Sequence, residues 1–282
     1  MVQSGYQLST FLYGLGAGRR RLPTLPAPAP FPDDPNGWLL GVQPGEVSIP
    51  QGGDTSPHGR TSARQTDPTT CGSVSVLLSQ ACLDAVHPQD APDSPATTPL
   101  NSGQPATSPS ARQRIVTDYG AAQHETKKRT NSRAFAGIWT WPHRWGTPPW
   151  GAARELGTTG VRYRHQIVSP ASLPHTRKVL TYAVDCAMRG YPVLLYTGSD
   201  TRVSVSAAVP RHVVVLHSPP VVADAAPTLF LFDPATGVNH AVNRDELTNR
   251  DTPPEFLGGW RHIVWAVFPN QPAQTTQQKV EP

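Results

Sequence analysis

The sequence Gln65-Thr-Asp-Pro-Thr-Thr-Cys71-Gly-Ser-Val-Ser-Val-Leu-Leu78 joins a polar loop to an apolar segment and carries the clearest structural signal in this chain. Apolar residues recur there at three- and four-residue spacing, at Val74, Leu77, Leu78, Ala81 and Ala85. This spacing predicts a helix that begins at Cys71, with Thr70 as its N-cap. A thiol at a helix N-terminus faces the positive end of the helix dipole, which favours the nucleophilic thiolate.

The rest of the chain predicts an α+β fold, with helices first and a sheet after them. Residues 174–189 have the apolar periodicity of a helix, and Gly190 follows as a C-terminal cap. Thr147 and two prolines predict a shorter helix that runs to Leu156 and ends at Gly157. The polar stretch 111–130 is compatible with a further helix. Five short β-branched or aromatic runs predict strands of one mainly antiparallel sheet, at 192–196, 212–217, 228–232, 238–242 and 263–268.

The composition predicts one folded domain. Of 282 residues, 32 are prolines and only 37% are hydrophobic, and much of the proline falls in two polar stretches. We therefore expect a disordered Pro/Gly-rich arm over residues 1–62, a folded domain over 63–269 and a disordered tail over 270–282. Within the arm, residues 37–42 are expected to form a short strand or a docking segment. The Pro/Ser/Thr-rich residues 87–110 are expected to form a flexible surface insertion.

Two polar residues flank one of the predicted strand connections. His212 begins a strand and Asp233 ends the next one, and the connection between them, 218–227, has no helical pattern and is too short for a parallel crossover. The two strands should therefore pair antiparallel, which brings the start of the first beside the end of the second. This connectivity predicts that His212 and Asp233 lie at the same edge of the sheet.

Together with Cys71, these residues supply the parts of a thiol site that cleaves amides. Cys71 would attack a carbonyl carbon, and His212 would take the thiol proton and return it to the leaving group. Asp233 would hold the imidazole in the useful tautomer. Gln65 offers its side-chain amide to the oxyanion, beside the backbone N–H of Cys71. Neither a cofactor nor a metal is expected, because no Cys pair or Cys/His cluster has zinc spacing.

The spacing of Gln65, Cys71 and Gly72 resembles that of papain-like cysteine peptidases. The segments Gly190-Tyr-Pro-Val-Leu-Leu, Arg211-His212-Val-Val-Val-Leu and Leu231-Phe-Asp233-Pro-Ala-Thr-Gly237 are closer to one branch, the leader-cleaving peptidase domains of bacteriocin exporters and their stand-alone relatives. Further segments resemble an uncharacterised actinobacterial family of this type, namely Thr-Thr-Cys71-Gly-Ser, Gly146-Thr-Pro-Pro-Trp-Gly and Leu257-Gly-Gly-Trp260.

This resemblance covers about residues 63–269. It implies a papain-like fold in which the nucleophile helix packs on the sheet, and a catalytic set made of Cys71, His212, Asp233 and Gln65. Two features depart from the exporter domains: Thr70 stands where they usually have Asp, and the 87–110 insertion is unusual.

Each candidate residue also has a purely structural interpretation. Cys71 alone would fit a small buried helix residue, which is the role expected for Cys82 and Cys186. His212 alone would fit a hydrogen-bonded residue at a strand end. His217 is the main alternative base, but it ends its strand, away from the expected position of the aspartate.

Asp233 and Gln65 have structural interpretations of the same kind. Asp233 would suit the turn Asp-Pro-Ala-Thr-Gly that it begins, in addition to orienting a histidine. Gln65, a polar residue in a loop before a helix, needs no functional explanation by itself. The catalytic interpretation therefore depends on the four residues occurring together.

The bulk properties narrow the remaining functional classes. Three cysteines argue against a disulfide framework and favour a reducing, cytoplasmic setting. No membrane span is predicted. The net charge of +4 is scattered apart from 19–21 and 127–129, so no specific nucleic-acid partner is expected.

The sequence thus predicts a cysteine peptidase or amide hydrolase with a peptide or protein substrate, and it indicates no oligomeric state. An acyltransferase or a glutamine deamidase would use the same triad. A catalytically inactive papain-like binding or assembly protein is the alternative from another class, because long Pro-rich segments suit an interaction protein.

Overall fold

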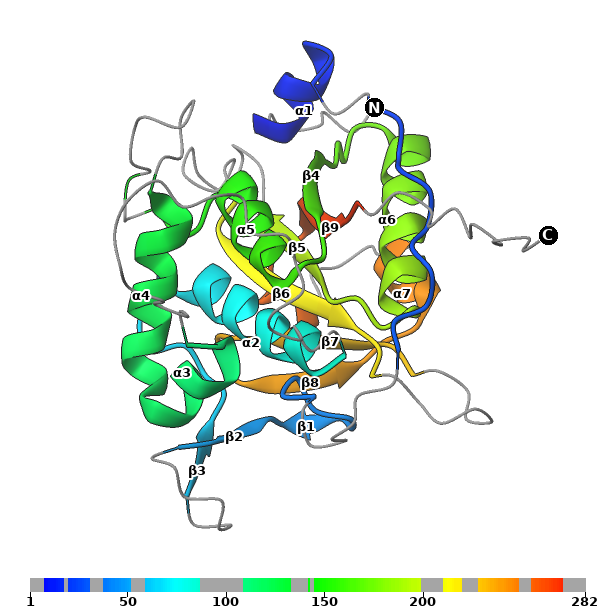
Figure 1. The fold of residues 1–282 in the computed structure, drawn as a ribbon. Helices are drawn as coiled ribbons and strands as arrows, with labels where there is room; N and C mark the ends of the chain where they lie inside the picture. The colour runs from blue at the N-terminus through cyan, green and yellow to red at the C-terminus, as the bar shows by residue number, and fades with distance from the viewer. Residues whose placement is uncertain are drawn as a thin grey trace, which may run out of the picture.

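The structure, a computed structural model, describes residues 8–17, 20–30, 38–51, 59–86, 109–132, 142, 145–198, 210–219, 228–248 and 255–270. In this part of the chain the main sheet has seven strands in the order β1-β8-β7-β6-β5-β9-β4, and every neighbouring pair is antiparallel (Figure 1). The strands are β1 (Gly45–Glu46), β4 (Tyr163–Ile167), β5 (Val193–Gly198), β6 (His212–His217), β7 (Phe230–Asp233), β8 (Val238–Ala241) and β9 (His262–Pro269). A separate antiparallel pair consists of β2 (Ser48–Pro50) and β3 (Arg60–Ser62).

Helices cover both faces of the main sheet (Figure 1). One face carries α2 (Cys71–Val86), α3 (Ala111–Thr117), α4 (Tyr119–Asn131) and α5 (Pro149–Leu156), and the other carries α6 (Leu173–Ala187) and α7 (Arg244–Thr248). The short helix α1 (Leu8–Gly14) lies near β4, and the 3-10 turns η3 (Gly157–Thr159) and η5 (Glu255–Leu257) follow α5 and precede β9. Among the described residues, no helix combines the length and the apolar character that crossing a membrane requires. The predicted α+β class with a mainly antiparallel sheet is confirmed.

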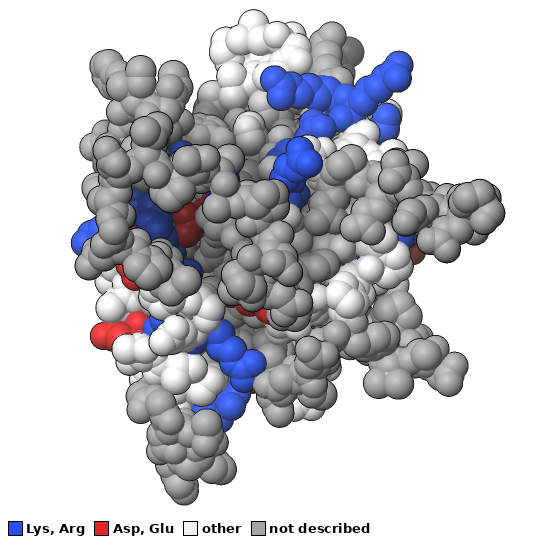
Figure 2. All heavy atoms as spheres, viewed as in Figure 1, with Lys and Arg blue, Asp and Glu red and all other residues white. Residues whose placement is uncertain are grey.

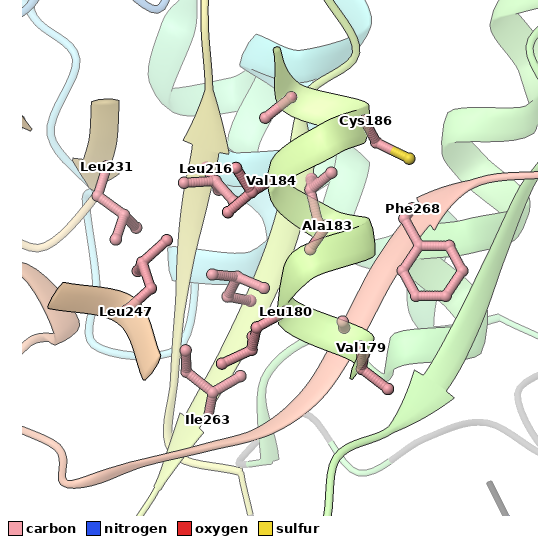
Figure 3. Packing of buried hydrophobic residues seen from close by; sticks show 14 of the residues in the cluster. Val179, Leu180, Ala183, Val184, Cys186, Leu216, Leu231, Leu247, Ile263 and Phe268 are labelled. Carbon is pink, nitrogen blue, oxygen red and sulfur yellow. The ribbon is translucent and has the colours of Figure 1, made fainter. Parts of the chain in front are cut away.

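The central strands are buried on both faces, and alternate side chains enter two different layers of the core. On β6, Val213 and Val215 pack in the clusters on the α2 side, whereas Val214 and Leu216 pack in the cluster that contains α6. Figure 3 shows Leu216 beside Val184 of α6. Burial on both faces explains why this strand is apolar at every internal position instead of alternating.

α2 is buried around nearly its whole circumference, because the sheet covers one side and α3, α4 and α5 cover the others. The predicted helix from Cys71 is confirmed, but its polar side is buried as well as its apolar side. Several polar side chains there have partners inside the protein, although the buried hydroxyl of Ser79 has none among the described residues. Ser75 donates its hydroxyl to the carbonyl of Val213 (3.5 Å), and Gln80 donates its amide to the carbonyl of Glu155 (2.8 Å). Such internal hydrogen bonds replace the solvent that an ordinary surface helix would meet.

The other predicted elements agree with the structure except at their ends, and the stretch 111–130 forms two helices, α3 and α4, that meet at Asp118. The backbone at Gly190 has a φ of 82°, in keeping with the predicted cap after α6. Thr147 does not cap α5, because Pro148 occupies the cap position and the Thr147 hydroxyl lies 3.2 Å from that of Ser73. β4 has no counterpart among the predicted strands, since three of its five residues are polar. Residues 87–108 of the predicted insertion and 271–282 of the predicted tail lie outside the described residues.

The prediction of a disordered arm over residues 1–62 is wrong for the segments that the structure describes. α1, β1, β2 and β3 all fall in this range, and Trp38, Leu39 and Leu40 are at most 5% exposed within the core beneath α2. The indole N–H of Trp38 donates to Nδ1 of His217 (3.2 Å), and the Asn239 amide donates to the carbonyl of Leu40. The segment therefore docks on the sheet without forming a strand. A short apolar run without periodicity does not reveal such distant partners.

His217 provides a test of this packing. It is fully buried, and its Nε2 also bonds to the side-chain oxygen of Asn239 (3.0 Å). Burial lowers the pKa of His217 from 6.5 to about 4. His217 therefore binds a proton near pH 6.5 in the unfolded chain, but only near pH 4 in the folded protein. We expect the contribution of His217 to the free energy of unfolding to be fully present above pH 6.5. As the pH falls from 6.5 to 4, this contribution should be lost at about 1.4 kcal/mol per pH unit.

His217→Gln should flatten this acid dependence, because glutamine does not take up a proton in the unfolded chain. Urea unfolding of the wild type and of the variant between pH 6.5 and pH 4 measures the two slopes. Parallel slopes would show that His217 does not exclude the proton.

Candidate active site

Three elements bring Cys71, His212 and Asp233 together. Cys71 is the first residue of α2, His212 is the first residue of β6, and Asp233 is the last residue of β7. β6 and β7 pair antiparallel with Val215 opposite Phe232, so the start of one strand lies beside the end of the other. As a result, Nε2 of His212 lies 2.6 Å from Oδ1 of Asp233. The proximity that the connectivity predicted is observed.

The His212 ring connects the carboxylate to the thiol. Its Nε2 faces Asp233, and Cys71 is a second hydrogen-bond partner, which leaves Nδ1 as the nitrogen that faces the sulfur. Burial by itself lowers the pKa of His212, but the hydrogen bond to Asp233 and the interactions with Cys71 raise it to about 10. Cys71 and His212 are only 5% and 7% exposed, so little solvent screens these interactions. The surroundings therefore favour the protonated, imidazolium form of His212.

Asp233 is held by the turn that follows it. Its Oδ1 also accepts from the backbone N–H of Ala235 (2.8 Å), and its carbonyl accepts from the N–H of Gly237 (2.8 Å), which has a φ of 74°. Burial raises the pKa of Asp233, but the hydrogen bond and charge of His212, together with the Ala235 N–H, lower it below its usual value. The carboxylate therefore shapes the turn and bonds to the histidine at the same time.

Gln65 lies in a loop that is tied to this turn. Its backbone N–H donates to the carbonyl of Pro234 (2.8 Å), the residue after Asp233. Its side-chain oxygen is buried and has no hydrogen-bond partner among the described residues. Buried polar atoms normally have partners, so this oxygen, unlike most, does not help to hold the described part of the fold together.

The first turn of α2 is closely covered. The carbonyl of Thr70 accepts from the N–H of Val74 (2.9 Å), so the predicted cap residue does begin the helix, but its hydroxyl donates to the carbonyl of Asp67 (2.9 Å) in the preceding loop. The first backbone N–H groups of a helix have no acceptor within it, which leaves them suited to an anionic oxygen. On the other side, a Cβ at Gly72 would lie 2.6 Å from Cβ of Thr147. Only glycine fits beside Cys71 at this contact.

Gly258 is a part of the site to which the sequence assigns no role. Its φ is 65°, and a Cβ there would lie 2.5 Å from Cδ2 and 3.0 Å from Nε2 of His212. The backbone at Gly258 thus packs on the edge of the ring that faces Asp233. The signal in the sequence was the pair Gly258-Gly259. Adjacent glycines indicate left-handed backbone, but they do not indicate which side chain that backbone contacts.

The other histidine and cysteines considered from the sequence lie away from this site. His217 ends β6 and bonds to Trp38 and Asn239, so it is not the partner of Asp233. Cys82 and Cys186 are fully buried, as expected, and burial raises the pKa of each thiol to about 12.

Within the described residues, no group of three or more His, Cys, Asp or Glu side chains is placed to hold a metal ion. The sequence matches no known family model and no curated protein. The chemical interpretation of the site therefore rests on its own geometry.

Gly258→Ala tests the contact on His212. The added methyl group would displace the ring or the loop, so we expect the rate at which iodoacetamide alkylates Cys71 at neutral pH to fall by roughly 10- to 100-fold. Mass spectrometry of the cysteine-containing peptides measures this rate.

Gly259→Ala is the matched control. Gly259 has a similar φ of 74°, but a Cβ there meets no atom within 4 Å. This variant should lose about 1 kcal/mol of stability from the strained backbone and keep the reactivity of Cys71. Equal losses of reactivity in both variants would contradict a specific role for Gly258.

Proposed function

We propose that this protein is a papain-like cysteine hydrolase that cleaves amide or peptide bonds through an acyl-thioester on Cys71. One observation carries the proposal: the His212 ring bridges the Asp233 carboxylate and the Cys71 thiol within a buried site. Thiol, imidazole and carboxylate in this order are the parts of nucleophilic acyl transfer. A nucleophile helix packed on an antiparallel sheet is consistent with the papain-like resemblance of the sequence.

Before the first half of the reaction, Nδ1 of His212 already holds the proton from Cys71, and the sulfur then attacks the substrate carbonyl carbon. Negative charge develops on the carbonyl oxygen, to which the backbone N–H of Cys71 and the Gln65 amide donate. The imidazolium then protonates the leaving nitrogen, the C–N bond breaks, and the acyl group stays on the sulfur. Asp233 stabilises the imidazolium and fixes its tautomer.

Water completes the reaction. Neutral His212 takes a proton from a water molecule, whose oxygen adds to the thioester carbonyl. The C–S bond then breaks, the carboxylic acid leaves, and the sulfur recovers a proton from His212. An amine in place of water would make the protein an acyltransferase, and a glutamine side chain as substrate would make the reaction a deamidation. The same residues serve all three reactions.

We infer a peptide or protein substrate in the cytoplasm. All three cysteines are free and buried, which suits a reducing compartment. A specific nucleic-acid partner is not part of this proposal. Figure 2 shows Lys and Arg in separate groups on the face that it displays, with Asp and Glu beside some of them. A protein that binds nucleic acid by charge would instead be expected to carry a basic patch or stripe.

A second candidate is a binding or assembly protein that keeps this arrangement without turnover, and the burial of the site favours it. Cys71, His212 and Asp233 are 5%, 7% and 2% exposed, which leaves a substrate carbonyl little access to the sulfur. A hydrolase must admit its substrate to this atom, whereas a binding protein need not. The reactivity of the thiol therefore separates the two candidates.

Alkylation of the native protein with iodoacetamide at a series of pH values tests the hydrolase. We expect Cys71 to react at least about tenfold faster than Cys82 and Cys186 near neutral pH, because the latter two are buried thiols without an imidazole partner. His212→Ala should remove this advantage. Mass spectrometry of each cysteine-containing peptide gives the three rates.

Cys71→Ala is the companion variant, since alanine fills nearly the same space. It should abolish turnover of any amide substrate while the melting temperature changes little. Slow labelling of all three thiols would overturn the hydrolase and favour the binding protein.

A further inference from the structure

A pocket of about 490 Å³ lies between the N-terminal segment, β4 and the first turns of α6. Pockets that hold small molecules have volumes of roughly 300–1,000 Å³. The buried residues Gln166 and Val179 belong to its lining. Val179 and Ala266, the sheet partner of Gln166, lie in the cluster that contains α6, whereas Cys71 lies in a cluster on the α2 side. The pocket is therefore separate from the candidate active site.

Three positively charged side chains line this pocket, namely Arg20, Arg21 and Lys178, and no Asp or Glu accompanies them among the described lining residues. Other cations of the protein, such as Arg129 and Arg244, pair with carboxylates. Figure 2 shows a group of Lys and Arg near the top of the molecule, with no Asp or Glu visible within it. Like charges around one pocket repel one another, so a bound anion would stabilise this arrangement.

The segment that carries the two arginines is held against β4. Arg164 donates from Nη1 to the carbonyl of Arg21 (3.1 Å) and from Nη2 to Oε1 of Gln166 (2.8 Å). Its guanidinium thereby adds a positive charge behind the pocket. The Arg21 backbone and the Gln166 side chain are fixed by these bonds without a ligand, and such preorganisation lowers the cost of binding one.

An aromatic pair forms another part of the wall. The rings of Tyr13 and His175 both line the pocket, and their centroids are 4.5 Å apart. Nε2 of His175 donates to the carbonyl of Ile167 (2.8 Å), which fixes the imidazole. Leu22 adds apolar surface to the lining. The pocket therefore offers a surface for a planar or apolar group as well as charge for an anion.

We propose that this pocket binds a phosphate monoester that carries a planar or apolar group. A phosphate monoester has a charge of about −1.5 to −2 at neutral pH and three acceptor oxygens, so it matches three cations better than a single carboxylate does. Arginine guanidinium groups bind phosphate oxygens in pairs. The organic group lies against Tyr13 and Leu22. This binding site goes beyond the proposed function and does not depend on the chemistry of Cys71.

Isothermal titration calorimetry of the full chain with adenosine monophosphate (AMP) tests the proposal. A salt concentration of about 0.15 M screens the attraction between distant exposed charges. We expect saturable binding of one AMP per chain, and binding of inorganic phosphate at least about tenfold weaker, because phosphate alone leaves the aromatic wall uncovered. Lys178→Gln should weaken AMP binding about tenfold, since it removes one charged contact. Arg20→Gln combined with Arg21→Gln should weaken it further.

Lys128→Gln is the matched control. Lys128 is also an exposed helical lysine, but it lies on α4, on the other side of the sheet. This variant removes the same charge and should leave the affinity for AMP unchanged. The proposal would be overturned by an absence of saturable AMP binding, by equal weakening in Lys178→Gln and Lys128→Gln, or by inorganic phosphate that binds as tightly as AMP.

Discussion

The packing of α2 on the start of β6 is the contact on which the rest of the structure depends. The helix is enclosed by the sheet on one side and by α3, α4 and α5 on the others, so its first turn cannot shift without disturbing two buried clusters. Cys71 takes its position from this enclosure, and His212 takes its position from the strand on which the helix rests. The β6–β7 pairing then adds Asp233. The thiol, the imidazole and the carboxylate therefore meet at one corner of the sheet. They do so because α2 is enclosed by its neighbours, α2 packs on β6, and β6 pairs with β7.

The two histidines of β6 show that burial alone does not define the chemistry of this corner. His212 and His217 begin and end the same strand, and both are buried, so desolvation acts on both in the same direction. The neighbours of His217 are an indole N–H and an amide oxygen, which carry no charge. The neighbours of His212 are a carboxylate and a sulfur. The protein therefore holds one ring neutral and the other charged within a single strand, by the choice of partners.

Much of the site could be predicted because it follows from local rules. The apolar spacing after Cys71 indicated its helix, and the short link 218–227 required antiparallel pairing of the strands that carry His212 and Asp233. The parts that could not be predicted depend on contacts between distant segments. Trp38 bonds to a residue 179 positions away. The contact of Gly258 with His212 requires the loop before β9 to reach the start of β6. The papain-like relationship and the activity remain predictions.

The order of the elements along the chain has a consequence for synthesis on the ribosome. His212 follows Cys71 by about 140 residues, and β9, an interior strand of the sheet, comes near the end of the described chain. At about 5–20 residues per second, Cys71 is made roughly seven to thirty seconds before His212. During that interval the nascent chain contains Cys71 but neither His212 nor Asp233. The arrangement of Cys71, His212 and Asp233 is therefore complete only after the late strands join the sheet.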